Sequence, residues 1–177
     1  EVELDLASGF SFAPLPALAR GDLDLVVTSD PVDLPGITYV PLFTYEALLA
    51  VANQHGLAPR PFVRAEDLAS ETLITYPVEI ERLDIYTRFL LPAHASPARH
   101  KTIETTDIML QMVAAGRGVA ALPRWLVEDY GTRIPVRPVQ LGETGIPKQI
   151  FLGLRERDRE VDYLNSFMKL AREVRWN

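Results

Sequence analysis

The chain has 177 residues, 47% of them hydrophobic and 24% charged, which is the composition of a globular protein with an adequate core. The formal net charge of −6 argues against binding of a nucleic-acid backbone by this part alone, because such binding relies on clustered lysine and arginine. The lack of cysteine excludes disulfides, thiolate metal sites and cysteine nucleophiles, and no apolar run approaches the roughly 18 residues of a membrane span.

The first third of the chain predicts mainly strands. The predicted elements are a strand at 2–6, a helix at 14–20 and strands at 23–27, 37–43 and 45–52. The run from Leu23 to Val27 is rich in β-branched residues, which suits a strand buried in a parallel sheet.

From residue 59 onward, the pattern alternates between helices and strands. The predicted elements are a helix at 64–69, a strand at 72–75, a helix at 80–91, a strand at 100–104, a helix at 105–115, a strand at 118–122, a helix at 123–129, strands at 134–138 and 148–154, and a helix at 159–174. Such alternation is typical of an α/β fold with mostly parallel sheets.

The order of these elements predicts two lobes. Lobe I comprises 1–52 and 132–177, and lobe II comprises 53–131. Two crossing strands, one near 45–55 and one near 130–138, join the lobes. A cleft between lobes is a usual place for a ligand.

Three predicted strands end in hydroxyl side chains. Thr28 and Ser29 follow the first buried strand, Tyr76 follows a strand of lobe II, and Thr105 and Thr106 begin a helix. Ligands of open α/β sheets bind beyond the carboxyl ends of strands, and helix N-termini favour anions. The pattern therefore predicts a site for a small polar anion or zwitterion. The alternative is that these residues only cap a helix and start a turn.

The histidines and carboxylates do not predict a metal site or catalysis. His55, His94 and His100 lack the spacing of a helical metal site, and no cysteine assists them. A triad of Ser29, His100 and Asp30 can be assembled only on paper, since no nucleophile-elbow sequence supports it. We therefore expect a binding domain without enzymatic activity.

Several segments resemble the effector-binding domain of LysR-type transcriptional regulators. They are 21–25, 66–68 and above all 113–123, Val-Ala-Ala-Gly-Arg-Gly-Val-Ala-Ala-Leu-Pro, in the family's order, and the similarity covers essentially the whole chain. The resemblance implies a two-lobed, periplasmic-binding-protein-like α/β fold and a cytoplasmic sensing domain. It also implies a homodimer or homotetramer that binds DNA through a winged helix-turn-helix absent from this chain.

Within the family, the chain most resembles the regulators of methionine biosynthesis, in segments 8–12, 25–30, 67–73, 76–78, 82–84 and 111–115. These regulators use homocysteine as co-effector, so the resemblance implies homocysteine-responsive control of methionine-biosynthesis genes, with no metal or other cofactor. The family's effector contacts, carried over by position, fall on Phe10, Thr28, Ser29, Tyr76, Pro77, Val78, Thr105 and Thr106.

A periplasmic solute-binding protein for a small amino acid or anion is the alternative, since it shares the two-lobed layout. Such a protein needs a secretion signal upstream, whereas a regulator needs a basic helix-turn-helix. The resemblance also implies that the first strand and helix of the effector domain lie outside this chain.

Overall fold

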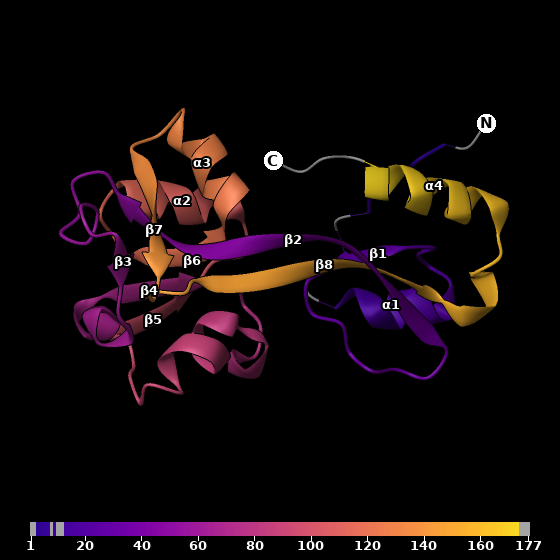
Figure 1. The fold of residues 1–177 in the computed structure, drawn as a ribbon, viewed down its shortest axis with the longest axis horizontal. Coiled ribbons are helices and arrows are strands. Elements are labelled where there is room, and N and C mark those ends of the chain that lie inside the picture. Colours follow the sequence, from indigo (N-terminus) through magenta and orange to yellow (C-terminus); the bar gives the residue numbers. More distant parts are fainter. Residues whose placement is uncertain (1–2, 8, 10–12, 174–177) are drawn as a thin grey trace. The chain divides into compact units, whose positions relative to one another are not determined.

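The computed structural model of the chain describes residues 3–7, 9 and 13–173. The chain packs into two compact units, shown in Figure 1: unit 1 is Glu1–Thr44 with Gln149–Asn177, and unit 2 is Tyr45–Lys148. Among the described residues, no helix combines the length and the apolar character needed to cross a membrane.

Two strands run from one unit into the other. They are β2 (Ile37–Ala52) and β8 (Ile146–Arg155). The prediction of a first crossing strand near 45–55 agrees with β2. The second crossing strand is β8 and not the segment near 130–138, which belongs wholly to unit 2. The lobe boundaries expected after residues 52 and 131 stay a prediction, since packing units and lobes need not divide a crossing strand at the same residue.

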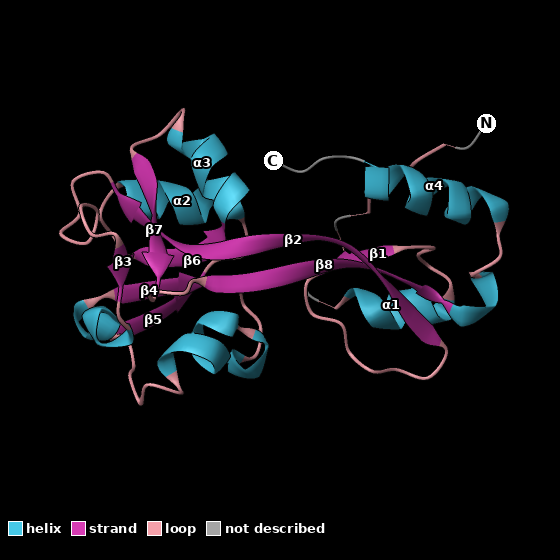
Figure 2. Ribbon diagram, in the orientation of Figure 1, coloured by secondary structure: helices cyan, strands magenta, loops and turns pink. Residues whose placement is uncertain are grey.

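Unit 1 has a small sheet between two helices (Figure 2). Besides parts of β2 and β8, its elements are α1 (Pro14–Arg20), β1 (Val26–Thr28), the 3-10 turn η4 (Glu156–Asp158) and α4 (Asp162–Glu173). One apolar cluster lies under α1 and another under α4: the first contains Leu15, Leu18, Val26 and Ile37, and the second Leu152, Leu154 and Met168.

Arg155, at the end of β8, links β8 to α1, to the segment before β1 and to η4. Its buried guanidinium donates to the carbonyl of Leu18 at 2.8 Å and pairs with Asp24 at 2.9 Å and with Asp158. It is thus a second donor to a carbonyl at the end of α1, which also accepts from the Gly21 amide at 3.1 Å.

Unit 2 has a larger sheet with helical segments on both faces. Besides parts of β2 and β8, its elements are β3 (Phe62–Val63), the 3-10 helix η1 (Ala65–Ser70), β4 (Thr72–Thr75), the 3-10 turn η2 (Ile80–Arg82), the π-helix η3 (Ile85–Leu90), β5 (Arg99–Thr102), α2 (Thr106–Ala114), β6 (Val119–Pro123), α3 (Arg124–Gly131) and β7 (Val136–Leu141). The helices α2 and α3 cover one face, and η1 and η3 cover the other (Figure 1).

The period of a strand explains these two layers. In β2, Leu49 and Val51 belong to the cluster that contains η3, whereas Ala50 between them belongs to the cluster of α2 and α3. Successive side chains of a strand point to opposite faces, so the continuous apolar run of β2 contributes to both clusters.

The described strands of both units are paired into one continuous sheet, which is mixed rather than mostly parallel. Its strand order is β1-β8-β2-β6-β4-β5, with β7 beside β2 and β3 beside β7. Parallel ladders join β4 to β5, β4 to β6 and β3 to β7, whereas β2 runs antiparallel to β6 and β7. The prediction of a parallel partner for 23–27 is wrong, because β1 pairs antiparallel with β8, a strand that enters unit 1 from unit 2.

Among the described residues, one predicted strand is absent, one predicted helix has a different helical form, and two predicted strands are joined. Residues 3–6 of the predicted strand 2–6 form no strand. Leu4 and Leu6 are exposed, so the alternation of apolar and acidic residues does not bury an apolar face here. The predicted helix 80–91 is η2 and η3, in which the Leu91 amide donates to the Tyr86 carbonyl five residues earlier. The strands predicted at 37–43 and 45–52 are one strand, since no turn residue separates them.

Candidate functional site

The carboxyl ends of β4 and β5 lie side by side in unit 2. The two strands are parallel, and Thr75 at the end of β4 is in register with Thr102 at the end of β5. The amide of Ile103 donates to the carbonyl of Thr75 at 2.9 Å and extends the ladder by one residue. The chain then enters α2, so hydroxyl residues after both strands gather at one edge of the sheet.

Two of the predicted site residues are in contact at this edge. The hydroxyls of Tyr76 and Thr106 lie 2.6 Å apart, although 30 positions separate them in the sequence. Thr105 precedes α2 in an extended conformation, and its side chain makes no capping hydrogen bond to any residue that the structure describes. The hydroxyls thus stand beside a helix N-terminus whose first amides attract anions.

Thr75 and His100 help to hold Tyr76 in position. The buried hydroxyl of Thr75 donates to the carbonyl of Tyr76 at 3.0 Å and lies 2.7 Å from Nε2 of His100. The ring of His100 packs edge-on against Tyr86, with 5.4 Å between ring centroids. Burial raises the pKa of the Tyr86 hydroxyl, which remains neutral in the physiological range. Sequence alone does not predict these positioning contacts; its one signal is a hydroxyl as the last residue of a buried strand.

The turn after Tyr76 brings in the two remaining site residues of unit 2. The amide of Val78 donates to the carbonyl of Tyr76 at 2.9 Å, and Pro77 lies between them. Pro77 is exposed and Val78 is half-buried. Five of the predicted contacts therefore belong to two short segments of the same unit, 76–78 and 105–106.

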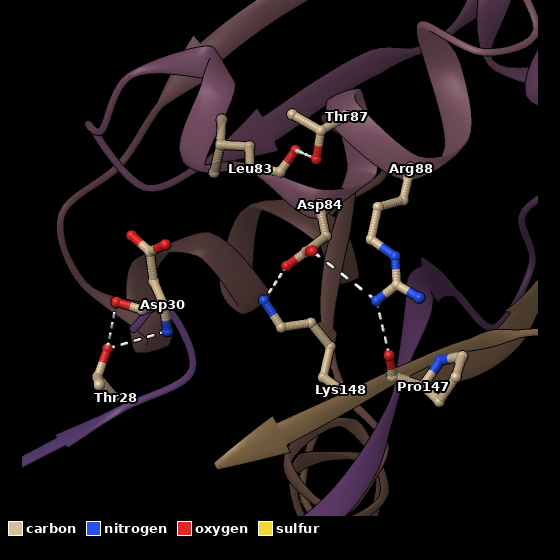
Figure 3. A network of polar contacts seen from close by, with 8 residues as sticks. All are labelled: Thr28, Asp30, Leu83, Asp84, Thr87, Arg88, Pro147 and Lys148. Carbon is tan, nitrogen blue, oxygen red and sulfur yellow. Dashed lines mark hydrogen bonds and ion pairs between the residues drawn. The ribbon is translucent and has the colours of Figure 1, made fainter. Parts of the chain in front are cut away.

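Thr28 forms a local turn in unit 1. Its hydroxyl accepts from the amide of Asp30 at 3.0 Å and lies 3.3 Å from the Asp30 carbonyl, as Figure 3 shows. This geometry agrees with the alternative in which the hydroxyl starts a turn. Ser29 is half-buried within that turn, and Phe10 lies outside the described residues.

An ion-pair cluster in unit 2 was not predicted from the sequence. Lys148, whose side chain is 11% exposed, pairs with Asp84 just before η3 (Figure 3). Arg88 donates to the carbonyl of Pro147 at 2.7 Å and lies 3.9 Å from Asp84. The cluster fastens η3 to the beginning of β8. The only sequence signal was the spacing of Asp84 and Arg88, four residues apart on a predicted helix.

His55, like His100, has structural partners. Nε2 of His55 lies 3.2 Å from a carboxylate oxygen of Glu71, and its Nδ1 accepts from the amide of Leu57 at 3.2 Å. Within the described ranges, no group of three or more histidine, aspartate or glutamate side chains is arranged to hold a metal ion.

Comparison with known proteins gives consistent results over the whole length of the chain. The family model described as the LysR substrate binding domain matches residues 1–176. The HTH-type transcriptional regulator MetR of Escherichia coli (strain K12) is 42% identical over 172 residues, which are 97% of this chain and 54% of the relative. The chain therefore spans about half the length of the curated relatives it matches.

Solved structures agree with this match. The regulatory domain of MetR, a LysR family regulator from N. meningitidis, superposes with a TM-score of 0.82 at 38% identity and covers 98% of this chain and 80% of that one. The BenM effector binding domain with its effector benzoate has a TM-score of 0.74 at 19% identity over 96% of this chain and 76% of that one, which shows the fold alone. The predicted α/β, periplasmic-binding-protein-like fold class is confirmed.

Proposed function

Because the chain belongs to the family of LysR substrate-binding domains, we propose that it is the effector-sensing part of a LysR-type transcriptional regulator. The observation that carries this proposal is the 42% identity to a MetR regulator over 97% of the chain. In this proposal the chain binds a small molecule without transforming it. The alternative of a periplasmic solute-binding protein is not favoured, since the matched relatives are transcriptional regulators by name.

The whole protein, in this proposal, acts in the cytoplasm as a homodimer or homotetramer. It binds DNA through a helix-turn-helix region outside this chain, in keeping with the description of its relatives as HTH-type regulators. Effector binding changes transcription only if the ligand has different affinities for two states of the protein, as any population shift requires.

Homocysteine is the proposed effector, because the resemblance is to regulators of methionine biosynthesis. The hydroxyls of Tyr76 and Thr106, 2.6 Å apart, suit its carboxylate, and so do the amides at the start of α2. A carboxylate that accepts from either hydroxyl competes with the bond between them, so ligand binding is coupled to the contact between β4 and α2. Thr105, Pro77 and Val78 complete the proposed contacts of this unit. Phe10, Thr28 and Ser29 stay predicted contacts.

Titration calorimetry with homocysteine tests this proposal. We expect saturable binding, and about tenfold weaker binding for both Thr106→Val and Tyr76→Phe, since loss of one hydrogen bond to a charged group costs roughly 1.5 kcal/mol. Thr132→Val is the matched control, because the Thr132 hydroxyl donates to the Asp129 carbonyl at 2.7 Å, at the end of α3. Absence of saturable heat, or an equal loss in the control, contradicts the proposal.

A further inference from the structure

An open pocket of about 360 Å³ lies in unit 2, apart from the residues of the proposed effector site. Its floor contains the buried side chains of Leu48, Ala58 and Val139. Three arginines, Arg60, Arg124 and Arg137, also line it. These residues come from the loop before β3, from the first turn of α3 and from β7. We call this hollow the arginine pocket.

The three guanidiniums of the arginine pocket are compensated unevenly by three carboxylates. Arg60 pairs with Asp67 at 2.6 Å. Arg124 pairs with Glu46 and, at 3.3 Å, with Glu128. Arg137 makes no ion pair or side-chain hydrogen bond with any residue in the described part of the chain. Arg137 therefore has no carboxylate partner of its own among the described residues, whereas Arg60 is held by one carboxylate and Arg124 by two.

The ion pairs orient the other two guanidiniums without using all their donors. A guanidinium has five N–H groups, whereas Arg60 directs one nitrogen to Asp67 and Arg124 directs its two terminal nitrogens to Glu46 and Glu128. Prolines at 59, 61 and 138 also line the pocket, and their fixed backbone angles limit the movement of its walls. The donors are thus partly preorganised, which lowers the entropy that ligand binding costs.

We propose that the arginine pocket binds a phosphate group, either as the free ion or as the monoester of a small molecule. A tetrahedral dianion directs oxygens toward several walls at once, whereas the two oxygens of a carboxylate lie in one plane. Guanidinium forks match phosphate oxygens in pairs. The volume is in the range of small-molecule sites, and the apolar floor has room for an organic part beside the phosphate.

A neighbouring hollow is lined by Arg64 and by the carboxylate of Asp67, besides two residues of the arginine pocket. It measures about 260 Å³, shares Arg60 and Pro61 with the arginine pocket, and adds the exposed side chain of Arg64. A monoester can therefore place its phosphate near Arg137 and reach toward a further cation past Arg60.

The test is an NMR titration of the arginine Nε–Hε signals of the chain with inorganic phosphate and with glycerol 3-phosphate, at constant ionic strength set with sodium chloride. We expect saturable shifts of Arg60, Arg124 and Arg137, and about tenfold weaker binding for Arg137→Gln. Arg99→Gln is the matched control, because Arg99 is also exposed on a strand and β5 is separated from β7 by three strands, β4, β6 and β2.

The two probes distinguish the possible sources of the phosphate. Tighter binding of glycerol 3-phosphate supports a monoester, and equal binding supports the free ion. Shifts that rise linearly without saturation, or an equal effect of Arg137→Gln and Arg99→Gln, overturn the proposal. The arginine pocket shares no residue with the proposed effector site at Tyr76, Thr105 and Thr106. A failure to bind homocysteine would therefore not change the expected result of the phosphate titration.

Discussion

Gly118 lies where any side chain would meet the neighbouring strand. Its φ is +157°, and a Cβ added there would collide with the backbone oxygen of Thr72 and lie 3.0 Å from two side-chain atoms of Ile74. Gly116, two residues earlier, has a φ of +67° after the end of α2. The Gly-Arg-Gly segment therefore both ends a helix and lets β6 approach β4, which keeps the site edge of the sheet in place.

Gly118→Ala should lower the free energy of unfolding by about 2 kcal/mol or more, because the new methyl group presses on backbone as well as on a side chain. Gly56→Ala is the control, since no atom lies within 4 Å of its added Cβ. Urea unfolding of both variants provides the measurement. Equal stability of the two variants would show that the contact at Gly118 relaxes at little cost.

At the level of single residues, the sequence predicted hydroxyls at strand ends but not their partners. The contact between Tyr76 and Thr106 joins residues 30 positions apart, and no local pattern encodes such a pair. The support of Tyr76 by Thr75 and His100 likewise depends on the register of β4 with β5. Sequence spacing indicates which residues follow a strand, whereas the fold decides which of them meet.

Asp67 stabilises the start of η1. The amide of Arg64 donates to its carboxylate at 2.8 Å, and the guanidinium of Arg60 lies 2.6 Å from its other oxygen. Both contacts, the backbone hydrogen bond first, lower the pKa of Asp67 below its ordinary value of 3.8. The carboxylate therefore contributes to stability only in its ionised form.

The pH dependence of Asp67→Asn follows from this sign. Because the pKa is lower in the folded state, the contribution is fully present above the unfolded value of 3.8 and disappears as the pH falls through the folded value. We expect the stability difference between wild type and Asp67→Asn to be greatest near pH 7 and to shrink below about pH 4. Urea unfolding across this range measures it. A difference that is constant down to pH 2 would contradict the role given to the ionised carboxylate.

At the level of elements, hydrophobic periodicity and capping residues predicted the position of a helix or strand well where they agreed on one type of element. The strand 72–75 has the predicted bounds, and α2 and α4 lie within the helices predicted at 105–115 and 159–174. The segment 80–91 differs because its core contacts favour a wider turn: Ile85, Tyr86 and Leu90 are all buried in one cluster. Helical periodicity alone does not distinguish a π-helix from an α-helix.

At the level of the whole molecule, the alternation of elements predicted the α/β class, and the resemblance identified the family. Pairing direction was not predictable in the same way. The partner of β1 is β8, and more than a hundred residues lie between the two strands, so no hairpin or crossover rule applied. The two strands that connect the units, β2 and β8, read in the sequence as ordinary strands. These two strands connect the units because each is long and continues from one unit into the other, and their amino-acid composition does not reveal this.

Hydrogen–deuterium exchange of the chain, with and without homocysteine, tests the central claim directly. The claim is that an effector binds where β4 and β5 end and α2 begins. At saturating homocysteine, the amides of residues 76–78 and 105–109 should exchange more slowly, because the ligand orders this edge of unit 2 and covers the start of the helix. Unchanged exchange in both segments, with protection confined to other parts of the chain, would contradict the claim.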